Sequence, residues 1–254
     1  MPFTKSIDTS PTQTLNLTQN PLTSEQFQQF QSHLLESTFT PSSYSSNQFF
    51  VGSSINLFFD PRHPRQFKRP DWFGVVGVDK LYQGKNIRRS YVSWQESFNP
   101  FIVIEFLADE TATEDLGQTP VGIDTIPTKW DVYEQFLRIP YYILFDPENN
   151  KLEAFHLVGS RYEQLEPTDQ QRIWIPGLEL GLGLWEGVYQ GIERQWLRWS
   201  DVRGSWIEVP KNKQPISQPK SEQIQKRKLI DQQQKIGQKL RENLKNIGQK
   251  IDSI

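Results

Sequence analysis

The sequence contains no cysteine, which excludes disulfide bonds, thiolate metal sites and a cysteine nucleophile. It has only three histidines, His33, His63 and His156, and they do not follow the spacing of a metal site. No apolar run approaches the length needed to cross a bilayer, and the N-terminus lacks the basic and apolar regions of a signal peptide. We therefore expect a soluble, cytoplasmic protein whose chemistry depends mainly on carboxylates and lysine.

The chain also lacks a strong net charge, but its charges are unevenly distributed. Residues 220–254 hold nine Lys and Arg against four Asp and Glu, a net charge of +5, which leaves the rest of the chain at −7. The main part of the chain therefore does not resemble a general nucleic-acid-binding surface. A nuclease can still have a locally acidic metal site, so the charge does not exclude that class.

Large apolar side chains are plentiful, with 16 Phe and 8 Trp among 254 residues, and they suffice for a core. Residues 1–24 are rich in Thr, Ser, Gln, Asn and Pro and are predicted to be a flexible N-terminal segment. Ser24 is then the expected N-cap of a short amphipathic helix over residues 25–35. Phe27, Phe30 and Leu34 recur there at helical spacing.

Two apolar runs, residues 55–59 and 72–78, predict strands separated by a proline-rich turn, and we expect them to form a hairpin or a neighbouring pair. A third run, "FIVIEFL" over residues 101–107, is apolar on both faces of a strand and therefore predicts a central strand covered on both sides. This run carries Glu105 at its centre. A buried carboxylate without a partner costs several kcal/mol, so Glu105 is expected to face a cation.

The second half of the domain predicts a helix over residues 129–139, capped by Thr128, and a two-sided apolar strand over residues 141–146. Residues 151–166 predict a hairpin-like pair of strands. The order of these elements predicts an α/β fold with a mixed sheet. The Trp-rich segment 174–200 is expected to be irregular and to wrap the edge of the core.

The C-terminal part has a different character from about residue 209. Residues 209–221 predict a linker, and residues 222–254 predict a basic amphipathic tail whose apolar residues follow steps of seven and then of four and three. A frayed amphipathic helix, a coiled coil that could supply a homodimer, and attraction to nucleic acid or another anionic surface are the three interpretations of this tail. Gly237 and Gly248 weaken the helix in isolation.

Asp71, in "RPDWFGVV", is a companion for Glu105, because it lies at the entrance of a neighbouring predicted strand. Two carboxylates from neighbouring strands form a hard oxygen site suited to Mg²⁺ or Mn²⁺. Such a metal ion would compensate the charge of Glu105. The alternatives are that Asp71 is a turn residue and that Glu105 pairs with a structural Arg or Lys.

Several of these stretches together resemble the Uma-two family of restriction endonucleases. The resemblance covers roughly residues 45–205 and rests on "PDWFGVV", "FIVIEFLADET", "EDLGQ", "KWDVYEQFLRIPYYILFDPENNKLEAFHLV", "YEQLE" and "WIPGLELGLGLWEGVYQG". It implies membership of the PD-(D/E)xK nuclease superfamily, and therefore a restriction-endonuclease-like mixed β-sheet core flanked by helices over residues 25–208, followed by the C-terminal helical extension. It also implies a metal-dependent DNA endonuclease.

The resemblance assigns Asp71 and Glu105 as ligands of Mg²⁺ or Mn²⁺. The superfamily's lysine normally follows the acid by two residues on the same strand, but Leu107 stands there in this chain. In this family the lysine is expected on the following helix, four residues before a tyrosine, which matches Lys129. If Thr128 caps that helix, Lys129 lies in the first turn, where the macrodipole disfavours a cation, so helix stability does not account for it.

Other polar and aromatic residues near these motifs carry weaker hypotheses. Asp60 and Asp109 are candidate additional metal ligands, and the basic residues of segment 62–69 could meet phosphates or form a solvated loop. The C-terminal tryptophans could stack on bases, although core and edge packing is favoured because they alternate with Leu, Val and Gly. They are Trp185, Trp196, Trp199 and Trp206.

The leading hypothesis is an enzyme that hydrolyses phosphodiester bonds of DNA, with Lys129 orienting the attacking water or stabilising the phosphorane. The second is a non-catalytic nuclease-fold module that binds DNA or assembles with partners. A glycosidase would need Asp71 and Glu105 to flank an open sugar cleft, which a central strand disfavours.

Overall fold

The computed structural model describes residues 22–108, 115–117 and 126–210. The chain divides into two units, Met1–Ile207 and Glu208–Ile254, and the fold below is that of the first unit. The predicted tail, most of the linker and of the N-terminal segment, and Asp109 lie outside the described residues. None of the helices in the described ranges is long and apolar enough to cross a membrane.

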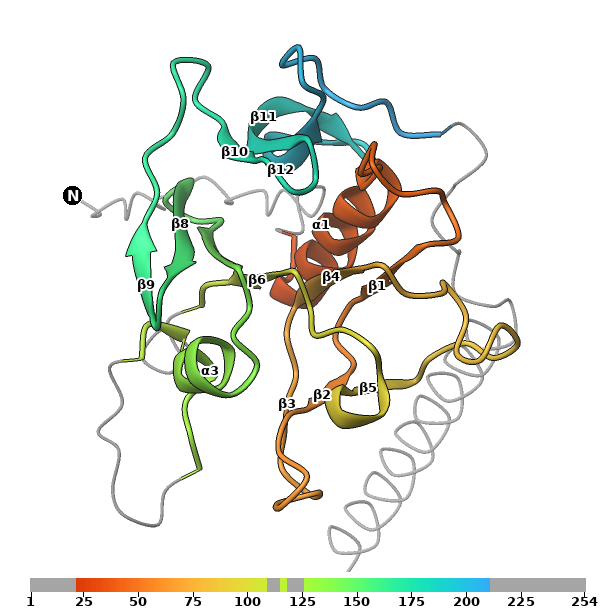
Figure 1. Ribbon diagram of the computed structural model, residues 1–254. Helices are drawn as coiled ribbons and strands as arrows, with labels where there is room; N and C mark the ends of the chain where they lie inside the picture. Colours follow the sequence, from red (N-terminus) through yellow and green to blue (C-terminus); the bar gives the residue numbers. More distant parts are fainter. Residues whose placement is uncertain (1–21, 109–114, 118–125, 211–254) are drawn as a thin grey trace, which may run out of the picture. The chain divides into compact units, whose positions relative to one another are not determined.

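A six-stranded mixed sheet forms the centre of the first unit (Figure 1). Its strands, in spatial order, are β1 (Phe49–Gly52), β4 (Trp72–Val76), β6 (Ile102–Phe106), β7 (Tyr141–Asp146), β8 (Lys151–Val158) and β9 (Arg161–Gln164). Only β6 and β7 are parallel neighbours, and the other pairs are antiparallel. The predicted mixed sheet is confirmed, with β6 as an interior strand whose five residues are all buried.

Helical elements lie on the connection between the two parallel strands, as a crossover connection requires. They are α3 (Lys129–Asp131) and the adjoining π-helical turn η2 (Val132–Phe136). Thr128 is the N-cap of α3, as predicted, and it forms a reciprocal capping box with Asp131. The predicted regular helix over residues 129–139 is shorter and wider, because the amide of Leu137 bonds to the carbonyl of Val132, five residues back, at 2.9 Å.

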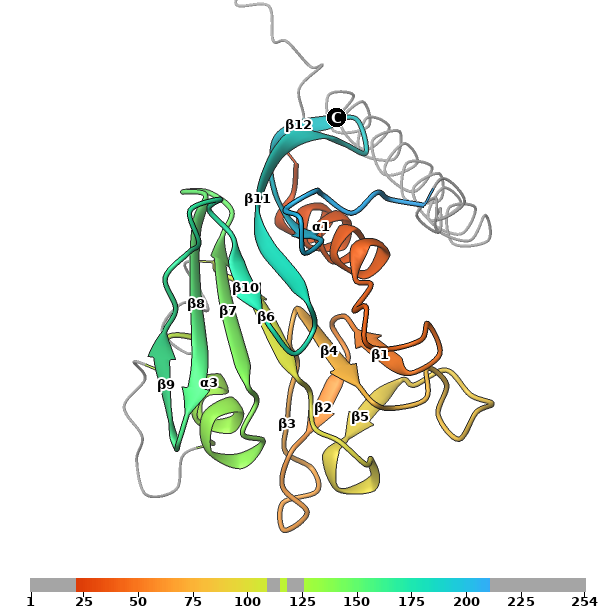
Figure 2. The ribbon, with the colours of Figure 1, turned by 45° about the horizontal axis from the view of Figure 1, so that its top comes forward.

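The opposite face of the sheet is covered by α1 (Ser24–Thr38). Its N-cap is Thr23 rather than the predicted Ser24, because the Thr23 hydroxyl accepts the amide of Gln26 while the Gln26 side chain returns to the Thr23 amide. Phe27 of α1 lies 5.7 Å from the ring of Phe106 and 6.0 Å from that of Trp196, between ring centroids. The helix therefore joins the central sheet to the C-terminal strands, which lie beside it in both views (Figures 1 and 2).

Those C-terminal strands correct one expectation. The segment expected to be irregular forms a three-stranded antiparallel sheet of β10 (Ile173–Ile175), β11 (Leu180–Tyr189) and β12 (Ile192–Ser200). The β11–β12 hairpin turns at Gln190 and Gly191, both with positive φ, of 53° and 78°. A two-residue turn of this kind matches the twist of the flanking strands. The buried Trp196 and Trp199 confirm the packing interpretation for these two side chains.

A second correction concerns the expected pairing of residues 55–59 with residues 72–78. The first run forms β2 (Asn56–Phe58), which lies between β3 (Phe67–Lys68) and β5 (Ser90–Val92) in a separate sheet. The second run forms β4, which lies between two antiparallel partners, the four-residue strand β1 and the strand β6. The two predicted strands exist but do not pair, because β1 and β6 occupy the two edges of β4. A short 3₁₀ helix, η1 (Ser93–Gln95), follows β5.

Candidate active site

The antiparallel register of β4 and β6 brings Asp71 beside Glu105. Trp72 is paired with Ile104, so Asp71, one residue before β4, lies next to the residue that follows Ile104. The amide of Asp71 donates to Oε2 of Glu105 at 3.0 Å, and the amide of Phe106 donates to Oδ2 of Asp71 at 2.7 Å. Each carboxylate is thus held by the backbone of the other strand, and the predicted pairing of these two acids in space is present.

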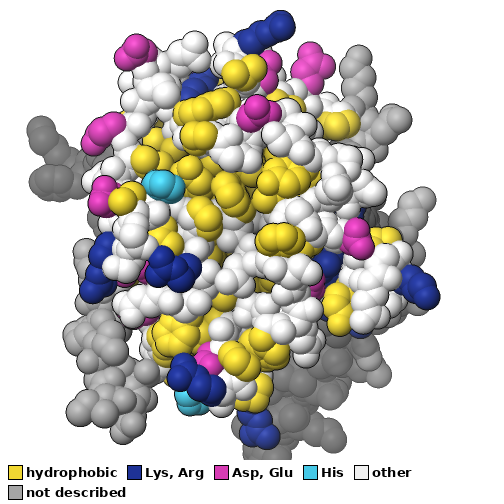
Figure 3. Space-filling model, in the orientation of Figure 1, with side chains coloured by type: hydrophobic (Ala, Val, Ile, Leu, Met, Phe, Trp, Pro, Cys, Tyr) yellow, Lys and Arg dark blue, Asp and Glu magenta, His cyan; other side chains and the backbone are white. Residues whose placement is uncertain are grey.

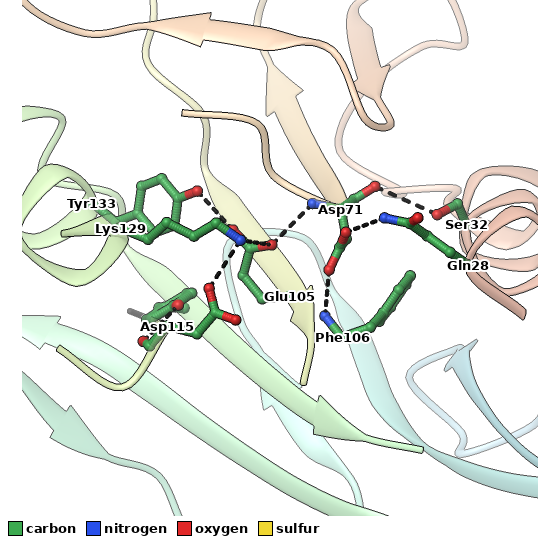
Figure 4. Close-up of polar contacts among 9 residues, drawn as sticks. Gln28, Ser32, Asp71, Glu105, Phe106, Asp115, Lys129 and Tyr133 are labelled. Carbon is green, nitrogen blue, oxygen red and sulfur yellow. Dashed lines mark hydrogen bonds and ion pairs between the residues drawn. The ribbon is translucent and has the colours of Figure 1, made fainter. Parts of the chain in front are cut away.

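Helix α1 supplies two further contacts to Asp71. The side-chain amide of Gln28 donates to Oδ1 of Asp71, and the hydroxyl of Ser32 lies 3.4 Å from its carbonyl oxygen (Figure 4). Gln28 and Ser32 are one helical turn apart and therefore face the same side of α1. The position of the Asp71 carboxylate is consequently fixed from both the sheet and the helix.

Lys129 is the cation that Glu105 faces. Its Nζ lies 3.0 Å from Oε2 of Glu105 and 2.9 Å from Oδ1 of Asp115, so it bridges two carboxylates (Figure 4). The hydroxyl of Tyr133, one turn further along the helix, donates to Oε1 of Glu105 at 2.7 Å. The structure therefore brings Asp71, Glu105 and Lys129 together, and it adds Asp115 and Tyr133 to them.

Burial dominates the protonation of the two central carboxyls. It raises the pKa of Glu105 to about 8, although the nearby Lys129 charge partly opposes this and the charges of Asp71 and Asp115 reinforce it. Burial also raises the pKa of Asp71, against the opposing effects of the Phe106 amide and Lys129. Burial therefore disfavours the charged forms of both acids, and a cation bound beside them would favour ionisation and lower both pKa values again.

The lysine remains charged in this environment. Burial by itself lowers the pKa of Lys129, but the charges of Glu105 and Asp115 more than offset it, so that the pKa is raised above its ordinary value. Burial also raises the pKa of Tyr133 well above its ordinary value, and the neighbouring Glu105 charge adds to this. Tyr133 is therefore a neutral hydroxyl that donates a hydrogen bond, and Lys129 supplies the positive charge.

A pocket of about 530 Å³ opens onto this cluster. Asp71 and Lys129 line it, together with residues from the first turns of α1, from the end of β6 and from the turn after β7. Glu105 itself is fully buried behind them. A ligand in the pocket could therefore contact Asp71 and Lys129 directly, whereas Glu105 does not line the pocket.

The donor set fits a hard divalent cation of the magnesium type. Two adjacent carboxylates with raised pKa values offer oxygen ligands, and Mg²⁺ is commonly held by only one or two protein carboxylates. In the described ranges no group of three or more His, Cys, Asp or Glu could hold a metal ion. The fit therefore concerns Asp71 and Glu105 alone, and a closed cage of protein ligands is not present in that part of the chain.

The weaker sequence hypotheses fare differently. Asp60 forms an ion pair with Arg62 and a contact with His63 of its own turn, and no described contact joins it to Asp71 or Glu105. Trp185 packs against the guanidinium of Arg198, and Trp206 against that of Arg172. These partners support packing roles for Trp185 and Trp206.

Sequence reasoning missed three members of the cluster. Tyr133 serves in the sequence only to locate Lys129, although its place four residues after that lysine puts both side chains on one face of a helix. Gln28 stands between two phenylalanines of α1, and this polar position inside an apolar stripe is a weak signal. Asp115 lies in a polar segment with several acids, and no local pattern distinguishes it from them.

Comparison with known proteins gives one family. Residues 17–190 match the family Uma2, described as "Putative restriction endonuclease". This range contains Asp71, Glu105, Asp115, Lys129 and Tyr133, and it ends before β12. No curated protein matches the chain.

Proposed function

The chain belongs to the Uma2 family, and from this premise we propose that it is a metal-dependent DNA endonuclease that hydrolyses phosphodiester bonds. The observation that carries the proposal is the position of Lys129, whose Nζ lies 3.0 Å from Glu105 at the wall of a pocket also lined by Asp71. A lysine beside a pair of carboxylates is a suitable arrangement for stabilising an anionic phosphorane.

The proposed roles follow from the contacts of each side chain. Asp71 and Glu105 would hold Mg²⁺ or Mn²⁺, which when bound polarises a phosphate and lowers the pKa of a coordinated water. Lys129 orients the attacking water or stabilises the negative charge that develops on the phosphate oxygens. Asp115 and Tyr133 are positioning residues, because they hold Nζ of Lys129 and Oε1 of Glu105 respectively.

Gln28 completes the arrangement from the other side. Its side-chain amide donates to Oδ1 of Asp71 and so limits the rotation of that carboxylate. On the face of the molecule in Figure 3, Lys and Arg are interspersed with acidic side chains and do not gather in one basic field. On this face, specific contacts are therefore expected to contribute more to DNA binding than a broad electrostatic surface.

The test is cleavage of supercoiled and linear DNA in Mg²⁺ or Mn²⁺, with EDTA as the metal-free reference. We expect metal-dependent nicking by the wild type and a loss of at least about a hundredfold in rate for Glu105→Gln and Lys129→Met. Asp60→Asn is the matched control, because it also changes a buried carboxylate beside a cation but lies outside the pocket. Each variant is first compared with the wild type by thermal unfolding.

A second function keeps the fold and omits the catalysis, as a module that binds DNA or assembles with partners. If the wild type binds DNA tightly but cuts no DNA with either metal, the binding module becomes the better account of the function. Equal cleavage by the wild type and Glu105→Gln would instead place any nuclease activity elsewhere. The predicted homodimer through residues 222–254 and the cytoplasmic location stay predictions, which light scattering and cell fractionation would test.

A further inference from the structure

A second cation, Arg194, lines the same pocket as Asp71 and Lys129. It comes from β12, which begins at Ile192, whereas the family match ends at residue 190. Lys129 already forms ion pairs with Glu105 and Asp115, so its charge is largely compensated within the protein. The pocket therefore contains Lys129, which two carboxylates neutralise, and Arg194, for which no ion pair is found among the described residues.

The guanidinium of Arg194 is held by aromatic rings and a carbonyl group. Its central carbon lies 4.4 Å from the ring centroid of Phe27 and 5.6 Å from that of Trp196, and Nη2 donates to the carbonyl of Pro147 at 2.6 Å. Nε is buried and has no hydrogen-bond partner in the described part of the chain. These contacts fix the orientation of the guanidinium without neutralising its charge.

No carboxylate of the described residues forms an ion pair with Arg194, although Glu25 and Glu148 line the same pocket. Burial lowers the pKa of Arg194, but an arginine remains protonated at neutral pH. A partly desolvated guanidinium that lacks an anionic partner is a favourable binding group for phosphate, which it can contact through two parallel N–H groups.

Helix α1 places this cation close to the catalytic cluster. Gln28, which contacts Asp71, directly follows Phe27, on whose ring Arg194 lies. The turn after β7 provides the other support, since its Pro147 accepts the hydrogen bond from Nη2. Asp71 and Arg194 therefore occupy two parts of one pocket that share a single turn of α1.

We propose that Arg194 binds a phosphate group of the nucleic-acid strand in this pocket, next to the phosphate that lies at Asp71 and Lys129. The proposal rests on the proposed nuclease function for the identity of the ligand. It makes Arg194 a binding residue contributed by a strand beyond the family match. The carboxylates of Glu25 and Glu148 repel phosphate from the remaining walls, so they restrict where along the pocket the strand can lie.

The competing interpretation is that Arg194 only packs α1 against β12. Arg172 provides a matched control, because its guanidinium carbon lies 3.5 Å from the ring centroid of Trp206 and Nη1 donates to the carbonyls of Gln170 and Gln171. Its Nε is likewise buried without a partner in the described ranges. Arg172 lines a different pocket, in which neither Asp71 nor Lys129 takes part.

The experiment measures binding of fluorescent duplex and single-stranded DNA by anisotropy, in EDTA, over a series of salt concentrations. Arg194→Met keeps an apolar stem over Phe27 and removes the charge. We expect it to weaken binding about tenfold and to reduce the slope of log affinity against log salt by about one. Arg172→Met is expected to retain wild-type affinity and slope.

Cleavage kinetics separate the two proposals. If the wild type cleaves DNA, Arg194→Met should raise KM with little change in kcat, because it removes binding and leaves the reacting groups in place. Wild-type cleavage with unchanged KM and salt slope in Arg194→Met would overturn the role of Arg194 and leave the nuclease standing. A third outcome is that the wild type cleaves no DNA while Arg194→Met still lowers the affinity and the salt slope. This result would refute the nuclease and retain the phosphate contact of Arg194.

Structural effects have their own controls. Equal weakening by Arg194→Met and Arg172→Met, or absence of DNA binding by the wild type, would overturn the inference. If Arg194→Met does not fold, Arg194→Lys is used, since lysine keeps the charge but not the two parallel N–H groups. It should bind DNA more weakly than the wild type with an unchanged salt slope, and wild-type affinity would count against the inference.

Discussion

Asp60 and Glu105 are both buried carboxylates beside a cation, yet their surroundings shift their pKa values in opposite directions. Hydrogen bonds from the side chains of Arg62 and His63, and from the Arg62 amide, lower the pKa of Asp60. Burial raises the pKa of Glu105 to about 8, despite an ion pair with Lys129. The contrast arises from which groups compensate the negative charge of each carboxylate and from where in the fold those groups come.

The partners of Asp60 belong to its own turn. Arg62 donates its amide to Oδ1 at 2.9 Å and its side-chain Nε to the same oxygen at 3.0 Å, and Arg62 itself is mostly exposed. Such a turn compensates its acid locally and can do so with little help from the rest of the fold. The partners of Glu105 come from the residue before β4, from α3 and from η2, so its environment exists only when the whole domain is assembled.

The first prediction removes the cation from each carboxylate. Lys129→Met leaves Glu105 and Asp115 buried without their shared partner, and we expect a loss of about 3 kcal/mol in the free energy of unfolding at neutral pH. Arg62→Met should change the urea midpoint little, because Arg62 is solvated. Urea denaturation of both variants measures the difference. If Lys129→Met lost less free energy of unfolding than Arg62→Met, Asp60 would depend on its cation more than Glu105 does, which is the opposite of our expectation.

The second prediction concerns pH. A folded-state pKa of Glu105 of about 8, above the ordinary 4.5, means that the folded protein binds more protons than the unfolded chain between these values. Stability should therefore fall as the pH rises from about 5 to about 8, by roughly 3 kcal/mol for this group, because each pH unit contributes at most about 1.4 kcal/mol. Asp71, whose pKa is also raised by burial, adds to the same trend.

Asp60 should behave in the opposite way. Its lowered pKa stabilises the folded state above the ordinary value of 3.8, and this contribution is lost as the pH falls through the folded pKa. Thermal unfolding from about pH 2 to about pH 9 covers both ranges in one series. Glu105→Gln should flatten the decline in stability between about pH 5 and about pH 8. Asp60→Asn should leave this decline unchanged. If the Glu105→Gln variant still loses stability steeply over this pH range, another group is responsible for the decline.

The contrast also explains how much of the site the sequence could predict. Glu105 was predicted to be buried and to face a cation, because the apolar run around it fits only a central strand, and Lys129 was expected on the following helix from the family resemblance. Asp115 could not be predicted, since its place in the cluster depends on an ion pair with Lys129, a residue distant from it in the sequence. Long-range contacts of this kind leave no periodic signal in the sequence.

The fold was predictable to a similar extent. Two-sided apolar runs predicted β6 and β7, and the cap at Thr128 predicted the start of α3. The β11–β12 hairpin was missed because its turn contains Gln190, a residue seldom associated with positive φ, and because glycines at alternate positions of β11 conceal the strand. Pairing between strands was the weakest prediction, because it depends on which other strands of the fold lie at the two edges of each strand.

The third prediction adds the metal ion. If Asp71 and Glu105 hold Mg²⁺ or Mn²⁺, the ion should stabilise the folded protein by roughly 1.4 kcal/mol at ten times its Kd, and raise the melting temperature by a few degrees. Glu105→Gln should lose this shift, and Asp60→Asn should keep it. Thermal unfolding with metal and with EDTA provides the measurement. An equal shift in Glu105→Gln would mean that the ion binds at another place.

The smallest effect is expected for Asp60→Asn. Asparagine keeps an oxygen that can accept the amide of Arg62 at the same position in the turn, and Arg62 and His63 are exposed enough to be solvated once the carboxylate charge is gone. The melting temperature should therefore fall only slightly, and DNA cleavage and the metal-induced shift should stay close to the wild type. A marked loss of cleavage in this variant would show that the local compensation of Asp60 does not separate it from the active site, and the turn at residues 60–63 would then belong to the substrate-binding surface.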